Sequence, residues 1–222
     1  MPSYVFRYVN AVGFGETTRL LLTAAKVEWT EESSDLEQAR LDHPNGIPVV
    51  LIQKNSDGSP DVVFNKFVTI ERYLARTYEF LPANPEQVEL QDQLRDEQSS
   101  LMKLLLSTVA LGIAANQDVR EFVFTVFERC LEMFLGSRVK LLRMNGNTGY
   151  SFGSTLSYTD MAIYSFMKLF IVDFATSSKE IARRFKCKMP PELAKLAATV
   201  ESDPLLEAHM SKNGRFANVF QG

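Results

Sequence analysis

The chain has 222 residues, of which 45% are hydrophobic and 23% are charged, and its formal net charge at pH 7 is −3. A chain of this length forms one or two globular domains with a sizeable apolar core. The composition is that of a water-soluble globular protein, and the small negative charge argues against a surface that binds nucleic acid or an anionic membrane.

No apolar run approaches the length of a membrane span, and residues 1–4 lack the charged and apolar regions of a signal peptide. The two cysteines cannot form a disulfide framework, so we expect a reducing, cytoplasmic location. Cys130 belongs to an apolar helical run. Basic residues surround Cys187, which is typical of a reactive thiol but also of a solvated helix end. With His43 and His209 as the chain's two histidines, we expect no metal site.

The first 80 residues alternate short β-rich runs with helical patterns. Because side chains alternate along a strand, Tyr4, Phe6 and Tyr8 share one face of the first strand. In chain order we expect a strand at 4–9, a helix at 16–26, a strand at 27–31, a short polar helix at 36–41, strands at 47–53 and 61–64, and a helix at 66–78. This pattern is βαβ followed by ββα, which predicts a small sheet with helices.

A Pro/Gly turn at residues 43–48 leads into the apolar strand at 47–53. Pro48 stands at the start of this strand, where its missing N–H matters least. A cis bond before Pro48 would turn the backbone of Ile47 so that its N–H and C=O face an extended peptide. A plain transition from loop to strand explains the same residues.

A proline-marked linker at 81–85 separates this part from a second half that is helical throughout. Its apolar periodicity predicts helices at 86–115 (unbroken, or interrupted near Gly112), 118–144, 161–174, 179–185, 191–202 and 204–210. Ser157 is a natural N-cap for the third of these helices, and Asp160 can return a bond to its backbone. That helix is almost entirely apolar, so we expect it at the centre of the helical half.

Short motifs in a fixed order resemble those of the cytosolic glutathione S-transferases, most closely the sigma class. Residues 1–28 align without a gap to the start of a sigma-class enzyme and place Tyr8 at its catalytic tyrosine. The other matching positions are 46–49 at the cis-proline turn, 70–75 in the next helix, 156–161 at the capping box, and the acidic residues Asp92 and Asp96. The resemblance implies an α+β two-domain fold, with a thioredoxin-like glutathione-binding domain at 1–80 and an all-helical domain at 86–222. It also favours the cis bond before Pro48.

The family's chemistry is the conjugation of glutathione to small apolar electrophiles, a detoxification reaction. The thiolate is the attacking form of the glutathione sulfur. The resemblance implies that the Tyr8 hydroxyl donates a hydrogen bond that stabilises this thiolate. Judged without the family, Tyr8 is more simply a core aromatic in an edge strand.

The resemblance distributes the rest of the glutathione site over three segments. The backbone of Ile47, beside Pro48, would hold the cysteinyl unit of the tripeptide. The helix N-terminus at Lys66–Val68 would attract the γ-glutamyl carboxylate. Asp96, contributed by the partner subunit of a homodimer, would meet the amino group, although a solvated helix face explains Asp96 equally.

Four features of this region depart from the family pattern. Phe14 stands where an arginine usually sits beside the tyrosine, and Phe67 stands where a serine holds the γ-glutamyl carboxylate. Lys66 replaces the glutamine before that serine, and the segment 35–44 is short and lacks the tryptophan and lysine that hold the glycine end. Each lost hydrogen bond to a charged group costs about 1.5–3 kcal/mol. Glutathione binding is therefore expected to be weak unless other groups compensate.

Arg40, His43 and Lys66 are the evident replacements for these lost contacts. Two functions remain open: a glutathione transferase with a rebuilt site, or a non-catalytic relative that serves as an apolar-ligand carrier, a crystallin-like structural protein or an interaction module. In the first, the electrophile pocket would be lined by Val12, Phe14, Met102, Leu105 and Phe220. In either case we expect a cytoplasmic homodimer that binds neither nucleic acid nor membrane.

Overall fold

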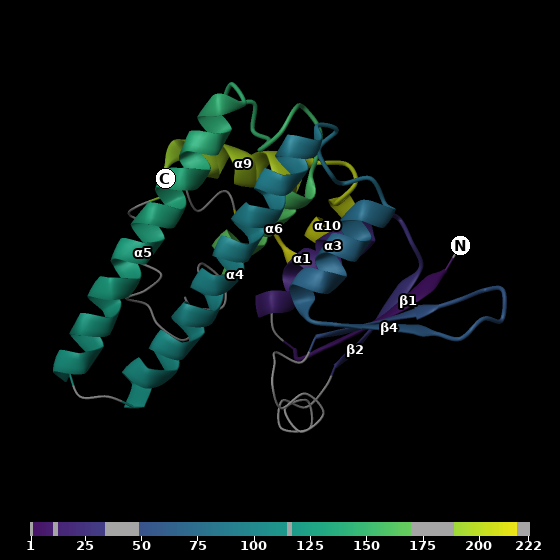
Figure 1. Ribbon diagram of the computed structural model, residues 1–222, viewed down its shortest axis with the longest axis horizontal. Helices are drawn as coiled ribbons and strands as arrows, with labels where there is room; N and C mark the ends of the chain where they lie inside the picture. The colour runs from purple at the N-terminus through teal and green to yellow at the C-terminus, as the bar shows by residue number, and fades with distance from the viewer. Residues whose placement is uncertain (1, 11–12, 34–48, 115–116, 170–188, 217–222) are drawn as a thin grey trace.

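The computed structural model describes residues 2–10, 13–33, 49–114, 117–169 and 189–216; at 105–114, 117, 118, 120 and 123 it describes the backbone alone. A small sheet with its own helices adjoins a larger group of helices (Figure 1). Two long helices, α4 (Pro85–Ala114) and α5 (Gln117–Met144), pack against each other and extend away from the sheet (Figure 1). The architecture is the two-domain α+β arrangement that the sequence predicts.

The sheet has four strands in the order β2-β1-β3-β4 within the described part of the chain. Strand β1 (Ser3–Tyr8) pairs in parallel with β2 (Trp29–Ser33) and antiparallel with β3 (Val50–Lys54). Strand β3 pairs antiparallel with β4 (Val62–Asn65). The predicted βαβ and ββα units are confirmed by this topology, with strand ends displaced by one to three residues.

Strand β1 lies inside the sheet, and one of its faces is apolar. Tyr4, Phe6 and Tyr8 are all buried, as the two-residue period predicts. Tyr4 lies opposite Trp29 of β2 and opposite Gln53 of β3 in the register. The end of β1 therefore carries Tyr8 into the protein interior.

Two helices share the core of this domain, α1 (Glu16–Ala24) and α3 (Phe67–Thr77). They lie together on one side of the sheet in Figure 1, and their residues contact each other. Their leucines and Ile70 belong to the same buried cluster as the aromatic residues of β1. This packing fixes the start of α1 and the start of α3 close to the end of β1.

The helical domain is built around α6 (Tyr158–Lys168), which is buried along its whole length. It contacts α1 of the sheet domain, α4 and α9 (Pro191–Ser202). The short helix α10 (Glu207–Asn213) packs back onto α1. The prediction that the apolar helix lies at the centre of the helical domain is confirmed.

A capping box begins α6, as the sequence predicts. The Ser157 hydroxyl accepts from the Asp160 N–H, and the Asp160 carboxylate accepts from the Ser157 N–H at 2.9 Å. The same carboxylate also accepts from the Ser151 N–H at 2.6 Å. The N-cap is Ser157, so the helix starts at Tyr158 with Asp160 at its third position, which confirms the predicted box.

Two other helix boundaries differ from the prediction for local reasons. Helix α1 ends at Ala24, before the predicted residue 26, because Lys26 has a φ of 52°, outside the helical region. Helix α10 begins at Glu207 because Asp203 and Leu205 form a turn in which the carboxylate accepts from the Leu205 N–H at 2.9 Å.

The predicted helices at 36–41 and 179–185, the bond before Pro48, and Cys187 lie outside the described residues. Of the helices that the structure describes, none is both long and apolar enough to cross a membrane. The described residues also contain no cluster of three His, Cys, Asp or Glu side chains able to hold a metal ion. Cys130 is a free, half-buried thiol packed against the core.

Candidate functional site

Tyr8 lies at the end of β1 under a tight turn, the 3-10 helix η1 (Gly13–Gly15). The backbone N–H of Phe14 donates to the Tyr8 hydroxyl at 3.0 Å, and the Tyr8 side chain is 4% exposed. A Cβ at Gly13 would stand 2.5 Å from the Tyr8 hydroxyl oxygen, and one at Gly15 would stand 2.6 Å from the ring. Glycine at both positions is therefore what lets the turn close over the phenol.

Arg19 of α1 covers the ring of Tyr8, a role that sequence reasoning missed. Its guanidinium carbon lies 5.6 Å from the centroids of both the Tyr8 and the Phe6 rings. Burial acts to lower the pKa of Arg19, but the carboxylates of Glu31 and Glu16 outweigh it and raise that pKa. Arg19 therefore stays a cation that holds the tyrosine ring from one side.

Phe14 and Phe67, the two aromatic departures from the family pattern, pack directly against each other. Their ring centroids are 4.6 Å apart with an interplanar angle of 50°, and each side chain is 4% exposed. Cations of α4 lie over the Phe67 ring: the Arg95 guanidinium carbon at 5.2 Å and the Lys103 ammonium nitrogen at 6.0 Å from its centroid. Phe14 and Phe67 thus form one apolar unit between the Tyr8 turn and α4.

The N-terminus of α3 carries the second predicted element of the site. Lys66 is its N-cap, is exposed and has a φ of 70°, and its side chain makes no capping hydrogen bond. The first N–H groups of a helix have no intrahelical partner, so this end keeps the polarity that attracts an anion. Phe67 turns its ring inward, whereas Val68 is half-buried at the next position.

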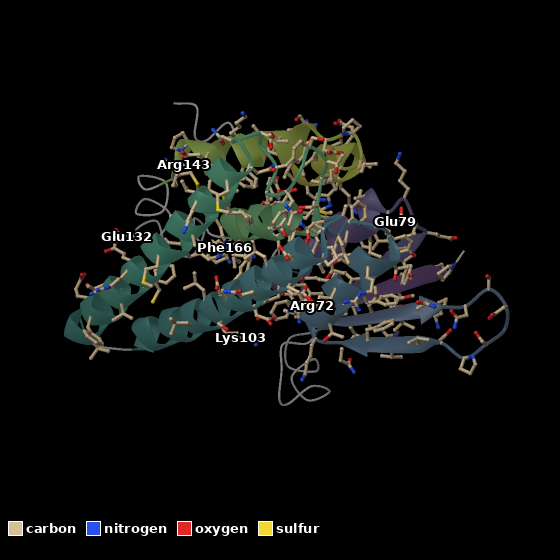
Figure 2. The ribbon with its side chains drawn as sticks, turned by 45° about the horizontal axis from the view of Figure 1, so that its top comes forward. Arg72, Glu79, Lys103, Glu132, Arg143 and Phe166 are labelled. Carbon is tan, nitrogen blue, oxygen red and sulfur yellow. The ribbon has the colours of Figure 1, made fainter. Side chains whose placement is uncertain are left out.

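Asp96 is engaged by a neighbouring side chain within its own chain. Its carboxylate forms an ion pair with Arg72 at 3.0 Å, and Arg72 also binds Asp92 at 3.0 Å. Figure 2 shows Arg72 where α3 and α4 meet, with Lys103 farther along α4. The Asp96 side chain is 64% exposed, so it remains accessible from outside the molecule.

Three of the residues predicted to line the electrophile pocket lie in the described part of the chain. Phe14 and Met102 are both buried in the cluster that contains Tyr8, and the Met102 sulfur lies 3.9 Å from an Arg95 nitrogen. Leu105 lies on α4, where the structure describes the backbone alone. The remaining predicted site residues lie outside the described residues: Val12, Arg40, His43, Ile47, Pro48 and Phe220.

A buried ion network underlies the site and was missed from the sequence. Arg95 of α4 donates to both Glu71 carboxylate oxygens, at 2.7 and 2.8 Å, and the Tyr158 hydroxyl donates to the same carboxylate at 2.7 Å. Burial acts to lower the pKa of Arg95, but Glu71 outweighs it and raises that pKa. The network ties α3, α4 and α6 together directly behind Phe67.

A second buried network joins α1 to the helical domain. The Glu16 carboxylate binds the Lys168 ammonium at 2.6 Å and His209 Nε2 at 2.8 Å. Burial acts to raise the pKa of Glu16, but the bond from His209 and the charge of Lys168 outweigh it and lower the pKa to about 2. Glu16 and His209 are 193 positions apart, and only the fold brings them together.

The architecture defines a class of fold. A mixed four-stranded sheet leads into a helical domain, a buried tyrosine ends the first strand, and the N-terminus of α3 follows the β3–β4 pair. This is the arrangement of the glutathione S-transferases.

Comparison with known proteins agrees with this class. Residues 113–213 match the family model "Glutathione S-transferase, C-terminal domain". The chain is 27% identical over 173 residues to glutathione S-transferase 3 of Caenorhabditis elegans, covering 73% of this chain and 78% of that protein. It is 25% identical over 222 residues to S-crystallin SL11 of Nototodarus sloanii, covering 98% of this chain and 100% of that protein.

Solved structures share the fold. A glutathione S-transferase from the hookworm Necator americanus, described as monomeric, superposes with a TM-score of 0.72 at 21% identity, covering 96% of this chain and 98% of that one. The chain therefore has the glutathione S-transferase fold, and its residues 113–213 are similar to the C-terminal domain of that family.

Proposed function

We propose that the protein is a glutathione transferase of weakened glutathione affinity, acting on small apolar electrophiles. The observation that carries this proposal is the Tyr8 hydroxyl, buried at the end of β1 and held by the Phe14 N–H at 3.0 Å. The glutathione thiol loses its proton to solvent, and the hydroxyl donates a hydrogen bond to the resulting thiolate. The sulfur then forms a bond to the electrophilic carbon while the leaving group departs with its electron pair.

The Phe14 N–H contributes to this role of Tyr8. A hydroxyl that accepts a hydrogen bond becomes a stronger donor, because successive hydrogen bonds polarise one another. A stronger donor stabilises the charged sulfur more than the neutral thiol and so lowers the pKa of the thiol. The glycine turn that brings this N–H to the hydroxyl is thus part of the proposed chemistry.

The weak affinity follows from Phe14 and Phe67. Phe67 cannot donate to the γ-glutamyl carboxylate, and Phe14 lacks the positive charge that an arginine would place beside Tyr8. Each lost hydrogen bond to a charged group costs about 1.5–3 kcal/mol, or about 10- to 150-fold in affinity. The N–H groups that begin α3 and the exposed Lys66 are the binding groups that remain at this end. We expect dissociation constants for glutathione from micromolar to low millimolar.

A non-catalytic role is the second candidate, and the contact between Phe14 and Phe67 favours it. The two buried rings pack against each other, at positions where a transferase of this family would place polar groups. A protein of this kind would be an apolar-ligand carrier, a structural protein or an interaction module. Its similarity to an S-crystallin fits the structural role.

One experiment separates the two candidates. Glutathione is titrated into the protein by calorimetry, and conjugation of 1-chloro-2,4-dinitrobenzene is measured for the wild type, Tyr8→Phe and Tyr73→Phe. Tyr73 also donates its hydroxyl hydrogen to a neighbour, Gln53, but lies outside the proposed site, so it is the matched control. A transferase binds glutathione and loses conjugation at least about tenfold in Tyr8→Phe alone. No heat at several millimolar glutathione sinks the proposal.

A gain-of-function variant tests the cause of the weak affinity. Phe14→Arg combined with Phe67→Ser restores both polar groups of the family pattern, so glutathione should bind at least about tenfold more tightly than to the wild type. Phe14→Leu with Phe67→Leu removes the aromatic contact without restoring a donor and serves as the control. Equal affinity of the two double variants would mean that something other than these side chains limits binding.

We further propose a cytoplasmic homodimer with Asp96 serving the site of its partner. The exposed Asp96 carboxylate and the exposed apolar residues of α5, among them Phe122 and Met133, support a second copy as the partner. Light scattering at micromolar concentration measures the mass directly. A monomer, as described for the hookworm relative, would remove the role of Asp96.

A further inference from the structure

Glu16 begins α1 directly after the turn that holds Tyr8, and its carboxylate is the centre of the second buried network. Its Oε1 meets the Lys168 ammonium at 2.6 Å and His209 Nε2 at 2.8 Å. Its Oε2 meets an Arg19 nitrogen at 3.4 Å. Helices α1 and α10 are close together near the centre of the molecule in Figure 1, and their residues are in contact. The carboxylate is therefore held by groups of α6, α10 and its own helix.

Two routes connect this carboxylate to Tyr8. The first is the backbone, because Gly15 precedes Glu16 and packs so closely on the phenol that a Cβ there would lie 2.6 Å from a ring carbon of Tyr8. The second is Arg19, whose guanidinium carbon lies 5.6 Å from the centroid of the same ring. Protein interiors are close-packed, so a displacement of Glu16 also displaces groups that touch Tyr8.

The start of α1 is held by contacts with distant segments. Its N-cap is Gly15, and no side chain caps it. The Glu16 carboxylate, in the first turn of the helix, is bound by α6 and α10. On the other side of the turn, the Phe14 ring packs on Phe67. These two attachments flank the Phe14 N–H that donates to the Tyr8 hydroxyl at 3.0 Å.

His209 is the more directional of the two partners of Glu16 Oε1. An ammonium group has three rotatable donors, whereas an imidazole nitrogen donates along one direction in the plane of the ring. The Glu16 carboxylate is ionised and can only accept, so Nε2 carries the hydrogen of this bond. The Asn213 amide nitrogen lies 3.3 Å from Nδ1 and donates to the His209 carbonyl at 3.1 Å, which fixes the ring from its other side.

We propose that His209 is a positioning residue that acts through Glu16 on the Tyr8 hydroxyl. Its bond holds the start of α1 so that the Phe14 N–H stays directed at the hydroxyl. The hydroxyl then remains a strong donor to a thiolate, because successive hydrogen bonds polarise one another. The effect on catalysis rests on the proposed transferase function, whereas the positioning of the turn does not.

Two variants at position 209 separate the hydrogen bond from the volume of the side chain. His209→Gln places an amide nitrogen near the position of Nε2 and can still donate to Glu16. His209→Leu fills a similar volume without a donor. Lys212→Gln changes an exposed residue of the same helix that lies outside the network, so it is the matched control.

Amide hydrogen exchange tests the positioning without glutathione. In His209→Leu, the Phe14 amide should exchange at least about fivefold faster than in the wild type, because the turn opens more often. In His209→Gln and Lys212→Gln it should exchange at the wild-type rate. The Met161 amide, which donates to the Ser157 carbonyl at 3.2 Å in the helical domain, reports any general loss of stability. Equal acceleration of both amides, or an unchanged Phe14 rate, would overturn the proposal.

Asn213→Ala keeps the proposal testable if His209→Leu does not fold. It removes the contact with Nδ1 by truncating an exposed side chain, so the buried network keeps all its charges. The Phe14 amide should exchange about two- to threefold faster, and the Met161 amide should be unchanged. If His209→Leu does not fold, a wild-type Phe14 rate in Asn213→Ala overturns the proposal.

Conjugation of 1-chloro-2,4-dinitrobenzene tests the consequence for the thiol. In His209→Leu, kcat should fall about 5- to 20-fold and the pKa of the bound thiol should rise in the pH profile, while the KM for glutathione stays the same. His209→Gln should restore both. In a Tyr8→Phe background, His209→Leu should cause no further loss, because the residue acts through the hydroxyl.

Failure of this proposal is distinguishable from failure of the transferase function. If the protein does not bind glutathione, the transferase function fails, and the exchange of the Phe14 amide still decides the role of His209. If conjugation occurs but His209→Leu lowers it equally in the wild-type and Tyr8→Phe backgrounds, the transferase function stands and the positioning role is overturned.

Discussion

Two buried glutamates connect the sheet domain to the helical domain, and they are neutralised in different ways. Glu71 meets a guanidinium through two hydrogen bonds, whereas Glu16 meets an ammonium group and an imidazole. The first network lies behind Phe67 and supports the proposed thiol site, while the second includes His209, which lines a cavity between α1, β2 and α10. The two buried carboxylates are therefore neutralised by cations of different chemistry.

A guanidinium keeps its charge at every pH at which a protein folds. Arg95, the cation behind Phe67, therefore stays charged throughout this range, and Glu71 raises its pKa further. The support beside the cavity depends on a carboxylate with a strongly lowered pKa, and its strength changes once that carboxylate is protonated. Substitutions in and around the two networks should therefore change stability by different amounts and with a different dependence on pH.

Arg95→Met should be the most destabilising of these changes. It leaves the Glu71 carboxylate buried with only the Tyr158 hydroxyl as a partner, and breaking a buried pair on one side costs about 3–5 kcal/mol. Urea unfolding at pH 7 measures the free energy. The double variant Glu71→Gln, Arg95→Met removes both charges and should recover part of the loss. A loss below about 1 kcal/mol in the single variant would show that the pair is not buried in solution.

Glu16→Gln should remove a pH-dependent part of the stability. The pKa of Glu16 is lowered from 4.5 to about 2, so its contribution is complete above pH 4.5 and is lost as the pH falls through about 2. A shift of that size corresponds to about 3 kcal/mol at neutral pH, as an order of magnitude.

The measurement is urea unfolding of the wild type and Glu16→Gln at pH 7 and at several values between 4.5 and 2. The difference in unfolding free energy should shrink as the pH falls. Glu32→Gln breaks an exposed pair with Arg7 and is the control, for which a near-constant difference is expected. A Glu16→Gln difference that stays constant across this range would contradict the lowered pKa.

Asp96→Asn should have the smallest effect on stability. Asp96 pairs with Arg72 on the surface between the same two helices that Glu71 and Arg95 join inside. Exposed ion pairs contribute about 0–1 kcal/mol, so the unfolding free energy should change by less than that. A loss of about 3 kcal/mol would mean that exposure does not distinguish the outer pair from the inner one.

Much of the fold follows from local patterns. Helix α9 was predicted at the bounds the structure gives, and the Ser157–Asp160 box was identified from its spacing, because capping and periodicity are local properties. The predicted C-terminus of α1 was wrong because the turn conformation of Lys26 ends this helix earlier. The predicted N-terminus of α10 was wrong because the turn at Asp203 delays the start of that helix.

The site was only partly predictable. Phe14 and Phe67 were identified as departures, but their mutual contact depends on how η1 and α3 pack. Glu16 and Lys168 were indistinguishable in the sequence from solvated charges on helix faces, because burial of a polar residue is set by tertiary packing. The cavity lined by Arg19 of α1 and Lys212 of α10 joins segments from opposite ends of the chain, and no local pattern marks it.

The contact between Phe14 and Phe67 has a consequence for selectivity among thiols. A transferase prefers glutathione to smaller thiols when its site binds the γ-glutamyl group. A site that forms hydrogen bonds to a substrate group discriminates strongly against substrates that lack this group. In the proposed site, Phe67 takes the position that would read this arm, and its ring packs against Phe14. The preference for the tripeptide over cysteine or its amides should therefore be shallow, and the protein should discriminate among thiols mainly by how readily each one loses its proton.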